Sequence, residues 1–423
     1  MQQTRRAAPK RRWWRSLLLF AAVLGPGFIT ASAGNDVGGI ATYSAAGAQY
    51  GYAILWVLIP LAIALIVVQE MAARMGTVTG KGLASLIRET FGVRVSFFAM
   101  LSLFVVNVGL TATEFAGVAT ASEIFGISRY IAVPIALVAV FLFILRFDNR
   151  IVERVFVGFS LIYISYAISA VLAHADWHAV AVGTLVPTLH VDDRQWMFLV
   201  IGLIGTTVSP YMQFFLQSAV VEKGTGEESL SFARADVVVG SIVGIAIAGF
   251  MIVANAATIF VANQHGGHIH PVQAQDFAVA LRPFGALAAT VFALGILNAG
   301  LFTATVLPLS TSYVICEALG FEAALDRKFS EAPIFFTIFG GGLILGALLV
   351  LLPGIPLLPL ILVSQTVQGV LLPAELVLML IIINRKSIMG DYTNSPFANA
   401  IAWTTAIVVG GLSLVFIVQQ LRG

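Results

Sequence analysis

The residues best suited to chemistry in this chain are Gly34 to Gly39, which interrupt an apolar segment running from about residue 16 to residue 46 and include Asp36. An ionised carboxylate at mid-membrane depth is costly, so Asp36 should face a cavity or a partner. The three glycines of this stretch oppose a continuous helix. A broken helix exposes carbonyls and half-helix ends beside the carboxylate, as in transporter cation sites. The stretch predicts ion binding, and the alternative is a glycine-rich packing surface beside a water-filled crevice.

A second interruption lies in the apolar segment 196–221, between Gly205 and Tyr211. Pro210 has no N–H to donate and its ring clashes with the carbonyl four residues earlier, which frees the Thr206 carbonyl for a ligand. The two interrupted segments are five segments apart, and such a pair is the best sequence indication of an inverted-repeat transporter site. A simple proline kink is the alternative for this segment taken alone.

Few other polar residues fall inside apolar segments. Glu114 and Glu375 are carboxylates within such segments. Glu70 precedes Arg74 by four residues, which predicts an ion pair near a helix end. Gln365 offers a neutral oxygen ligand, and an interhelical hydrogen bond is the alternative.

The histidines lie outside the apolar segments, which argues against an intramembrane imidazole proton relay. Three of them, His265, His268 and His270, lie in one predicted loop and could bind a transition metal, but this segment has the composition of a solvated loop. The predicted outer-loop histidines are His174, His178, His190, His265, His268 and His270.

The elements that position these groups are membrane helices. Hydrophobic residues make up 59% of the 423 positions and charged residues 10%, against roughly 25% charged residues in soluble domains. Most of the eleven apolar segments are long enough to cross a hydrocarbon core of about 30 Å. The predicted spans are 16–46, 50–73, 95–121, 130–146, 151–173, 196–221, 236–262, 284–316, 332–352, 356–384 and 397–420.

The distribution of basic residues predicts the orientation. The basic start of the chain precedes a long apolar run without a small-residue cleavage site, so it predicts a cytoplasmic tail and a retained first span. With this tail inside, eleven spans place the C-terminus outside, and the loops show a strong positive-inside bias. The basic residues on the outer side are then only Arg129, Arg194, Arg282 and Arg422.

Several motifs resemble the NRAMP divalent-metal transporters over about residues 16–420. The opening matches are Gly25-Pro26-Gly27-Phe28-Ile29, Asp36 to Thr42 and Gly47 to Tyr52; the later ones are Thr79 to Ala84, Ser364-Gln365 with Leu372-Pro373, and Arg385-Lys386 with Met389-Gly390. The resemblance implies an all-α polytopic membrane protein with a LeuT-like fold. In that fold two inverted five-helix repeats are followed by an eleventh helix, and helices 1 and 6 are broken. The expected parts are a tail (1–15), two repeats (16–173 and 196–384) and a last span (397–420).

The site motifs depart from this family in a consistent chemical direction. The family pattern Asp-Pro-Gly-Asn reads Asp36-Val37-Gly38-Gly39 here, Met-Pro-His reads Ser209-Pro210-Tyr211, and Asp-Leu-Ala-Glu reads Glu114-Phe115-Ala116-Gly117. Loss of a thioether removes a preference for softer transition metals. A roomier site with only oxygen donors suits Mg²⁺, which keeps several waters. The pattern is similar to that of the NRAMP-related magnesium transporters.

The resemblance and its departures together predict a secondary transporter that takes up Mg²⁺, and also Mn²⁺, as a largely hydrated ion by alternating access without proton coupling. Asp36 is the expected charged ligand, and the carbonyls of Ala33 and Thr206 add backbone dipoles. Gly39 and Ser209 give space and a hard polar wall, and Gln365 closes the site. Secondary candidates are Tyr211 and Glu114.

Three other functions remain open. A proton-coupled Mn²⁺/Fe²⁺ importer would use Glu114 to take the proton. A sodium-coupled carrier of small solutes could share the fold, and a passive cation channel is the third. An enzyme is not expected, because the spans contain no nucleophile–base–acid set. We expect the metal ion and the lipid bilayer as partners, and no cofactor, nucleic acid or protein partner.

Overall fold

The structure is a computed structural model that describes residues 34–146, 158–223, 230–321 and 330–421. All regular structure in these ranges is helical. Eight helical stretches there are long and apolar enough to cross a membrane, and Arg129–Ile144 and Leu161–Leu172 are shorter apolar helices. This is the architecture of a multi-pass membrane protein. The predicted tail and the first part of predicted span 1, which includes Ala33, lie outside the described residues.

Within the described residues, the helices of the first half overlap the predicted spans, and the first part of predicted span 5 (151–157) lies outside those residues. α3 begins in the middle of predicted span 1, and Gly51, whose φ of 59° favours glycine, makes the turn into the next helix. α9 lies in a stretch that was predicted as a loop. The elements are α3 (Val37–Tyr50), the 3-10 helix η1 (Gly51–Val57), α4 (Leu58–Thr79), α5 (Leu83–Ile124), α6 (Arg129–Arg146), η2 (Ser160–Tyr163), α8 (Ile164–Leu172) and α9 (Trp177–Leu185).

The second half begins with the broken helix formed by α10 (Arg194–Thr207) and α11 (Pro210–Glu222). Its other predicted spans correspond to α12, α14, α15, α16 and α18. The elements after α11 are α12 (Leu230–Asn255), η4 (Ala256–Phe260), α13 (Val261–Gln264), η5 (Ala274–Leu287), α14 (Ala288–Leu319), α15 (Pro333–Leu351), α16 (Leu357–Ile383), α17 (Lys386–Met389) and α18 (Pro396–Leu421).

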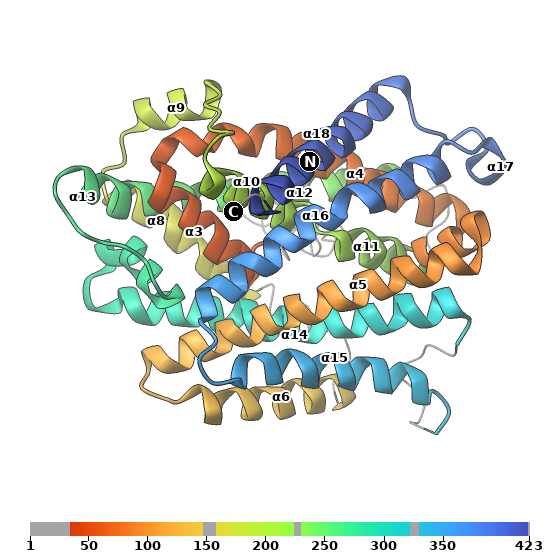
Figure 1. Cartoon of the computed structure of the whole chain (residues 1–423), viewed down its shortest axis with the longest axis horizontal. Coiled ribbons are helices and arrows are strands. Elements are labelled where there is room, and N and C mark those ends of the chain that lie inside the picture. The colour runs from red at the N-terminus through yellow and green to blue at the C-terminus, as the bar shows by residue number, and fades with distance from the viewer. Residues whose placement is uncertain (1–33, 147–157, 224–229, 322–329, 422–423) are drawn as a thin grey trace, which may run out of the picture.

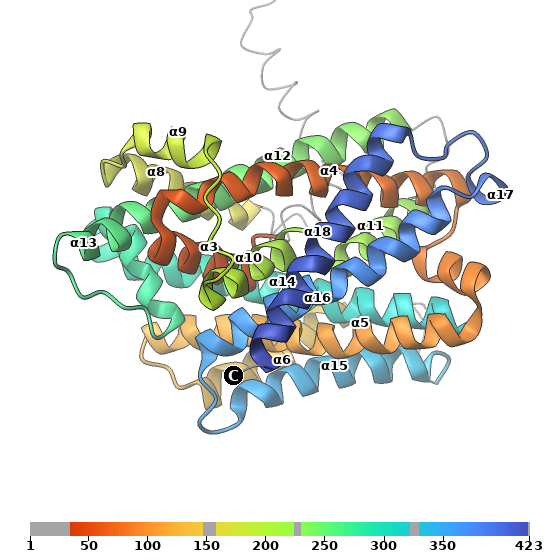
Figure 2. The same cartoon turned by 45° about the horizontal axis from the view of Figure 1, so that its top comes forward.

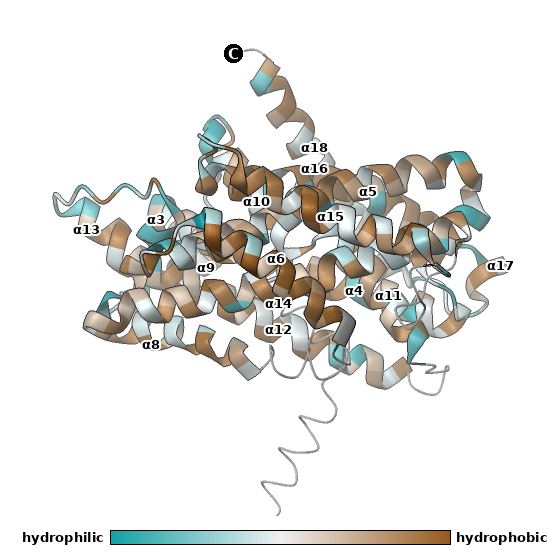
Figure 3. Ribbon diagram, turned by 90° about the horizontal axis from the view of Figure 1, so that it is seen from below, coloured by the Kyte–Doolittle hydropathy of each residue, from teal (hydrophilic) through white to brown (hydrophobic). Residues whose placement is uncertain are grey.

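The long helices pack side by side (Figures 1 and 2). α14 runs along α5, and α15 and α6 lie on the same side of the molecule. α12 packs against α3 and α4, and α10 packs against α16. Apolar residues dominate the helices, while hydrophilic residues gather mainly towards the two ends, around α13 and around α17 (Figure 3). This distribution matches a bundle that crosses a membrane between those ends.

A close contact between backbones joins α10 to α16. A Cβ atom added to Gly205 would lie 2.0 Å from the Gln365 carbonyl oxygen and 2.5 Å from the Gly369 nitrogen. A Cβ added to Gly369 would in turn lie 2.3 Å from the carbonyl oxygen of Ile201. Small residues let membrane helices approach this closely. The contact fixes the end of α10 against the middle of α16.

At the α13 end of the bundle, a hydrogen bond joins α3 to α10. The Tyr50 hydroxyl donates to Oδ2 of Asp193 at 2.6 Å, and Asp193 is the N-cap of α10. The Tyr50 ring also stacks on His190. The hydrogen bond from Tyr50 holds the pKa of Asp193 below its ordinary value. The two helices that carry Asp36 and Thr206 are therefore tied together far from those residues.

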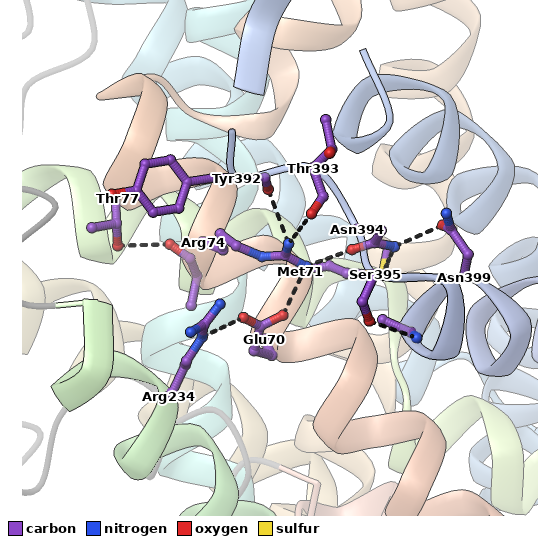
Figure 4. A network of polar contacts seen from close by, with 12 residues as sticks. Glu70, Met71, Arg74, Thr77, Arg234, Tyr392, Thr393, Asn394, Ser395 and Asn399 are labelled. Atoms are coloured by element: carbon purple, nitrogen blue, oxygen red, sulfur yellow. Dashed lines mark hydrogen bonds and ion pairs between the residues drawn. The ribbon is translucent and has the colours of Figure 1, made fainter. Parts of the chain in front are cut away.

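At the α17 end, a buried arginine ties three segments together (Figure 4). Arg74 donates to the carbonyls of Tyr392 and Thr393 at 2.9 and 3.0 Å and to the side chain of Asn394. It also pairs with Glu70 at 3.0 Å, which confirms the predicted ion pair. Glu70 accepts a second bond, from Arg234 of α12. This network joins α4, α12 and the loop before α18.

Candidate functional site

Asp36 lies at the start of a half-helix. It is the N-cap of α3, and its Oδ1 accepts a hydrogen bond from the Gly39 N–H at 2.6 Å. Aspartate is a preferred N-cap because its side chain satisfies one of the free N–H groups of the first turn. The side chain is 3% exposed. A buried carboxylate thus stands in the middle of the bundle at the N-terminus of α3.

Glu114 of α5 stands beside it. Its Oε2 accepts from the Val37 N–H at 3.5 Å, and its carboxyl group interacts directly with that of Asp36. The side chain is fully buried, and within the described residues its Oε1 has no hydrogen-bond partner. Gly300 of α14 allows close packing here, because a Cβ at that position would lie 2.6 Å from the Glu114 carbonyl oxygen. The structure therefore brings the two sequence-predicted carboxylates together.

The break between α10 and α11 faces the same place. Val208 and Ser209 have non-helical backbone angles, and Pro210 is the first residue of α11. Pro210 cannot donate to the Thr206 carbonyl, as the sequence predicted. Among the described residues, Thr206 Oγ1 has no partner, and it lies 3.3 Å from where a Cβ of Gly39 would be. The end of α10 and the start of α3 thus meet at Gly39.

Gln365 and Ser209 are joined through a residue that the sequence reasoning missed. Ser209 donates to Oε1 of Gln368, and Nε2 of Gln368 donates to Oε1 of Gln365 at 3.1 Å. Gln365 also lies against Gly38, since a Cβ there would be 1.6 Å from its Nε2. Gln368 could have been found from its spacing, because residues three apart in a helix share a face. α16 therefore presents two amides to the broken segments.

Two tyrosines complete the surroundings. Tyr211 is 2% exposed, and its hydroxyl has no partner in the described parts of the chain. Tyr43, which the sequence analysis did not single out, shares a 2.8 Å hydrogen bond with Thr207 and so joins α3 to the end of α10. Of the predicted site residues, only Ala33 lies outside the described ranges.

The groups that meet here carry or attract charge in a definite pattern. The C-terminus of α10 carries partial negative charge and adds to the two carboxyl groups. The carboxyl oxygens of Asp36 and Glu114 and the Thr206 hydroxyl are donors of the kind that suits Mg²⁺ and Mn²⁺. The amide oxygen of Gln365 accepts from Gln368, and in the described residues its nitrogen is the unpaired atom. No group of three or more His, Cys, Asp or Glu able to hold a metal occurs in the described ranges, which include His265, His268 and His270. The site is thus a carboxylate pair with neutral oxygens around it.

Comparison with known proteins identifies the family. The family model described as natural resistance-associated macrophage protein-like (Nramp) matches residues 27–419. The chain belongs to the Nramp family. It is 28% identical over 408 residues to the divalent metal cation transporter MntH of Yersinia pestis (strain Pestoides F), covering 95% of each chain. It is 29% identical over 429 residues to the MntH of Bacillus subtilis (strain 168), covering 98% of this chain and 95% of the other.

Solved Nramp-family and related structures show the same fold. The manganese transporter of Eremococcus coleocola, in complex with an aromatic bis-isothiourea substituted compound, superposes with a TM-score of 0.75 at 21% identity, covering 99% of this chain and 89% of that one. The closed form of Mhp1, a nucleobase-cation-symport-1 family transporter, superposes with a TM-score of 0.55 at 12% identity, covering 93% and 92%. The LeuT-like fold expected from the sequence motifs is confirmed.

Proposed function

We propose that this Nramp-family chain is a secondary transporter that moves a divalent metal ion across the cell membrane by alternating access. The names of its relatives, divalent metal cation transporters and a manganese transporter, support the substrate class. The main structural support is that Asp36, Glu114 and the C-terminal end of α10 lie together at the start of α3. We propose that it works as an importer, with the N-terminus cytoplasmic and the C-terminus outside.

In the proposed site, Asp36 is the charged ligand, directly or through the water shell of the ion. The carbonyls of Thr206 and Ala33 provide backbone dipoles. The space expected at Gly39 is not free, because a Cβ there would lie 2.3 Å from the Gly34 carbonyl oxygen and 3.3 Å from Thr206 Oγ1; glycine instead lets the broken segments approach closely. Ser209 is held by Gln368 and contributes a polar wall rather than a free ligand.

The donor set supports both Mg²⁺ and Mn²⁺ as substrates. Mn²⁺ is the ion named for the solved Nramp relative, while carboxylate and hydroxyl oxygens also suit Mg²⁺. Sulfur and imidazole donors, which favour softer transition metals, are not among the residues that form this site. We therefore propose that Cd²⁺ competes poorly with either ion.

Uptake in proteoliposomes tests this proposal. Asp36→Ala should abolish both metal binding and Mn²⁺ uptake, and Asp36→Asn should retain the fold while losing most of the uptake. Undiminished transport by either variant would remove Asp36 from the site. Inhibition of Mn²⁺ uptake by added Mg²⁺ or Cd²⁺ then distinguishes a hard from a soft metal site. Strong inhibition by Cd²⁺ together with no inhibition by Mg²⁺ would overturn the proposed selectivity.

For coupling, we propose transport of the metal without a proton, because the second acid and the histidine of the family pattern are replaced by Gly117 and Tyr211. A proton-coupled importer is the second candidate, and the direct interaction of Glu114 with Asp36 favours it. Two neighbouring carboxylates repel each other when both are ionised, so a proton or a cation has to accompany them. Lumenal acidification that scales with metal uptake, and that disappears in Glu114→Gln, would establish the second candidate.

A further inference from the structure

Glu375 of α16 is a buried carboxyl group that the proposed metal site does not use. It is 6% exposed, and within the described residues neither of its oxygens has a hydrogen-bond partner. An ionised group inside a membrane protein is costly unless a cation or a polar partner accompanies it, and such residues mark ion pathways. Because no side chain of the described residues bonds to Glu375, a bound cation would be its stabilising partner.

The register of α16 relates Glu375 to the metal site. Gln368 and Glu375 are seven residues apart, which is close to two turns, so they share a face and are separated by about 10 Å along the axis. Gln368 contacts Ser209 at the break between α10 and α11. Glu375 thus follows the site along the same face of α16, in the direction of α17.

The opposite side of α16 faces α18. A Cβ at Gly410 of α18 would lie 3.6 Å from the Cβ of Pro373. Residues two apart in a helix differ by about 200° around the axis, so Glu375 points away from α18. It is directed into the bundle rather than towards the last helix or the lipid.

The helices on that side also carry unpaired polar atoms. α16 packs against α4 and α11, and α4 and α11 pack against each other at Gly76 and Gln217. Gln217 donates to the Lys81 carbonyl at 2.8 Å, but in the described structure its Oε1 has no partner. Gln69 on α4 is fully buried, and neither its amide oxygen nor its amide nitrogen has a hydrogen-bond partner in the described residues. Three adjoining helices thus carry buried oxygens without protein partners on the α17 side of Asp36.

We propose that Glu375 is a second cation-binding residue, which holds the divalent ion between the Asp36 site and the α17 end of the bundle. This inference rests on the proposed function. The predicted topology places the α17 end in the cytoplasm, so the ion reaches Glu375 after it leaves Asp36. Conduction through a protein requires binding that is favourable yet divided over several sites, so that the ion can leave again. Glu375 supplies the second site, and the amide oxygens of Gln69 and Gln217 stand on the neighbouring helices.

Glu375→Gln in proteoliposomes tests the proposal, because glutamine keeps the size and removes the charge. We expect Mn²⁺ binding to the detergent-purified variant, measured by calorimetry, to keep its affinity, while the initial rate of Mn²⁺ uptake falls about tenfold. Glu375→Asp should recover part of the rate. The matched control is Glu89→Gln, which removes an exposed glutamate paired with Lys81 and should leave uptake unchanged.

Three results would overturn the inference. The first is a wild-type uptake rate in Glu375→Gln, and the second is a loss of Mn²⁺ binding together with uptake in a variant that elutes as a folded protein. The third is an unchanged maximal rate whose pH dependence has disappeared, which would make Glu375 a proton site instead. If Glu375→Gln does not fold, Glu375→Met, which has a similar length and no charge, takes its place, and a wild-type rate in that variant has the same meaning as the first result. Asp36→Ala separates the two proposals, since retained Mn²⁺ binding there refutes the proposed function whatever Glu375 does.

Discussion

The close contact between α10 and α16 predicts different effects on stability for two alanine substitutions on α10, Gly205→Ala and Gly202→Ala. In Gly205→Ala the new Cβ would lie 2.0 Å from the Gln365 carbonyl oxygen and 2.5 Å from the Gly369 nitrogen. Both obstacles are backbone atoms, so the two helices have to separate by roughly 1 Å in a tightly packed interior. In Gly202→Ala, three residues earlier, the nearest atoms are side-chain atoms of Thr366 and Thr42, both at 3.4 Å. That is an ordinary contact.

The magnitudes follow from two opposing terms. Replacing glycine by alanine inside a helix stabilises it by about 1 kcal/mol, and Gly202→Ala keeps this gain. Overpacking costs about 1–3 kcal/mol, and more where backbone has to move, so Gly205→Ala should be destabilised overall. We expect the free energies of unfolding of the two variants to differ by about 2–3 kcal/mol. Gly205→Ala should also displace Thr206 and so reduce metal uptake.

Thermal unfolding of the purified variants in detergent, followed by Mn²⁺ uptake in proteoliposomes, measures both effects. Gly202→Ala should melt at or slightly above the temperature of the wild type and keep its uptake rate. Gly205→Ala should melt several degrees lower and lose most of the uptake. Equal melting temperatures for the two variants, or full activity in Gly205→Ala, would refute the close backbone contact and the position of Thr206 derived from it.

Three further predictions concern other contacts. Tyr50→Phe removes the hydrogen bond that lowers the pKa of Asp193, so this pKa should rise. A depressed carboxyl pKa stabilises the fold above the unfolded pKa and loses that effect as the pH falls through the folded pKa. Melting temperature measured against pH should therefore drop for Tyr50→Phe at neutral pH and converge with the wild type in acid. Arg74→Ala leaves buried acceptors unpaired and should cost about 3–5 kcal/mol, with Arg74→Lys in between, as measured by thermal unfolding. Gly47→Ala, whose Cβ would lie 2.3 Å from the Ile252 carbonyl oxygen, should separate α3 from α12 and lower both melting temperature and uptake.

Hydropathy was enough to locate the helices of the described ranges to within a few residues, because lipid-facing and core-facing residues are both apolar. Hydropathy failed to locate helical segments that contain several charged residues or are too short to span the membrane. α5 begins at Leu83, but Gly92 (φ 82°) breaks it, so its long second part starts close to the predicted residue 95. The short first part carries Arg88 and Glu89 and was predicted as a loop. α9 was missed for a different reason, because a nine-residue helix is too short to give the hydropathy signal of a membrane span.

The site was predictable only in part. Glycine and proline marked the breaks correctly, because their backbone effects are local. Which side chains meet across helices depends on rotation about each axis, which spacing within one segment does not reveal. Spacing places Gln368 on the same face as Gln365, but it does not reveal the contact of Gln368 with Ser209 on another helix. The interaction of Glu114 with Asp36 likewise follows from the packing of α5 against α3.

The hydrogen bonds of Arg74 have a consequence for the folding of the chain during its synthesis. Its acceptors at Tyr392 and Thr393 come 318 and 319 residues later in the chain. While the protein is being synthesised, the guanidinium of α4 has Glu70 beside it but lacks those carbonyls until the last helix is being made. A chain shortened before residue 392 would therefore leave Arg74 at its second span with Glu70 but without these backbone acceptors, and quality-control proteases would be expected to remove it. Synthesis of the segment that leads into α18 is what completes the hydrogen bonding of Arg74.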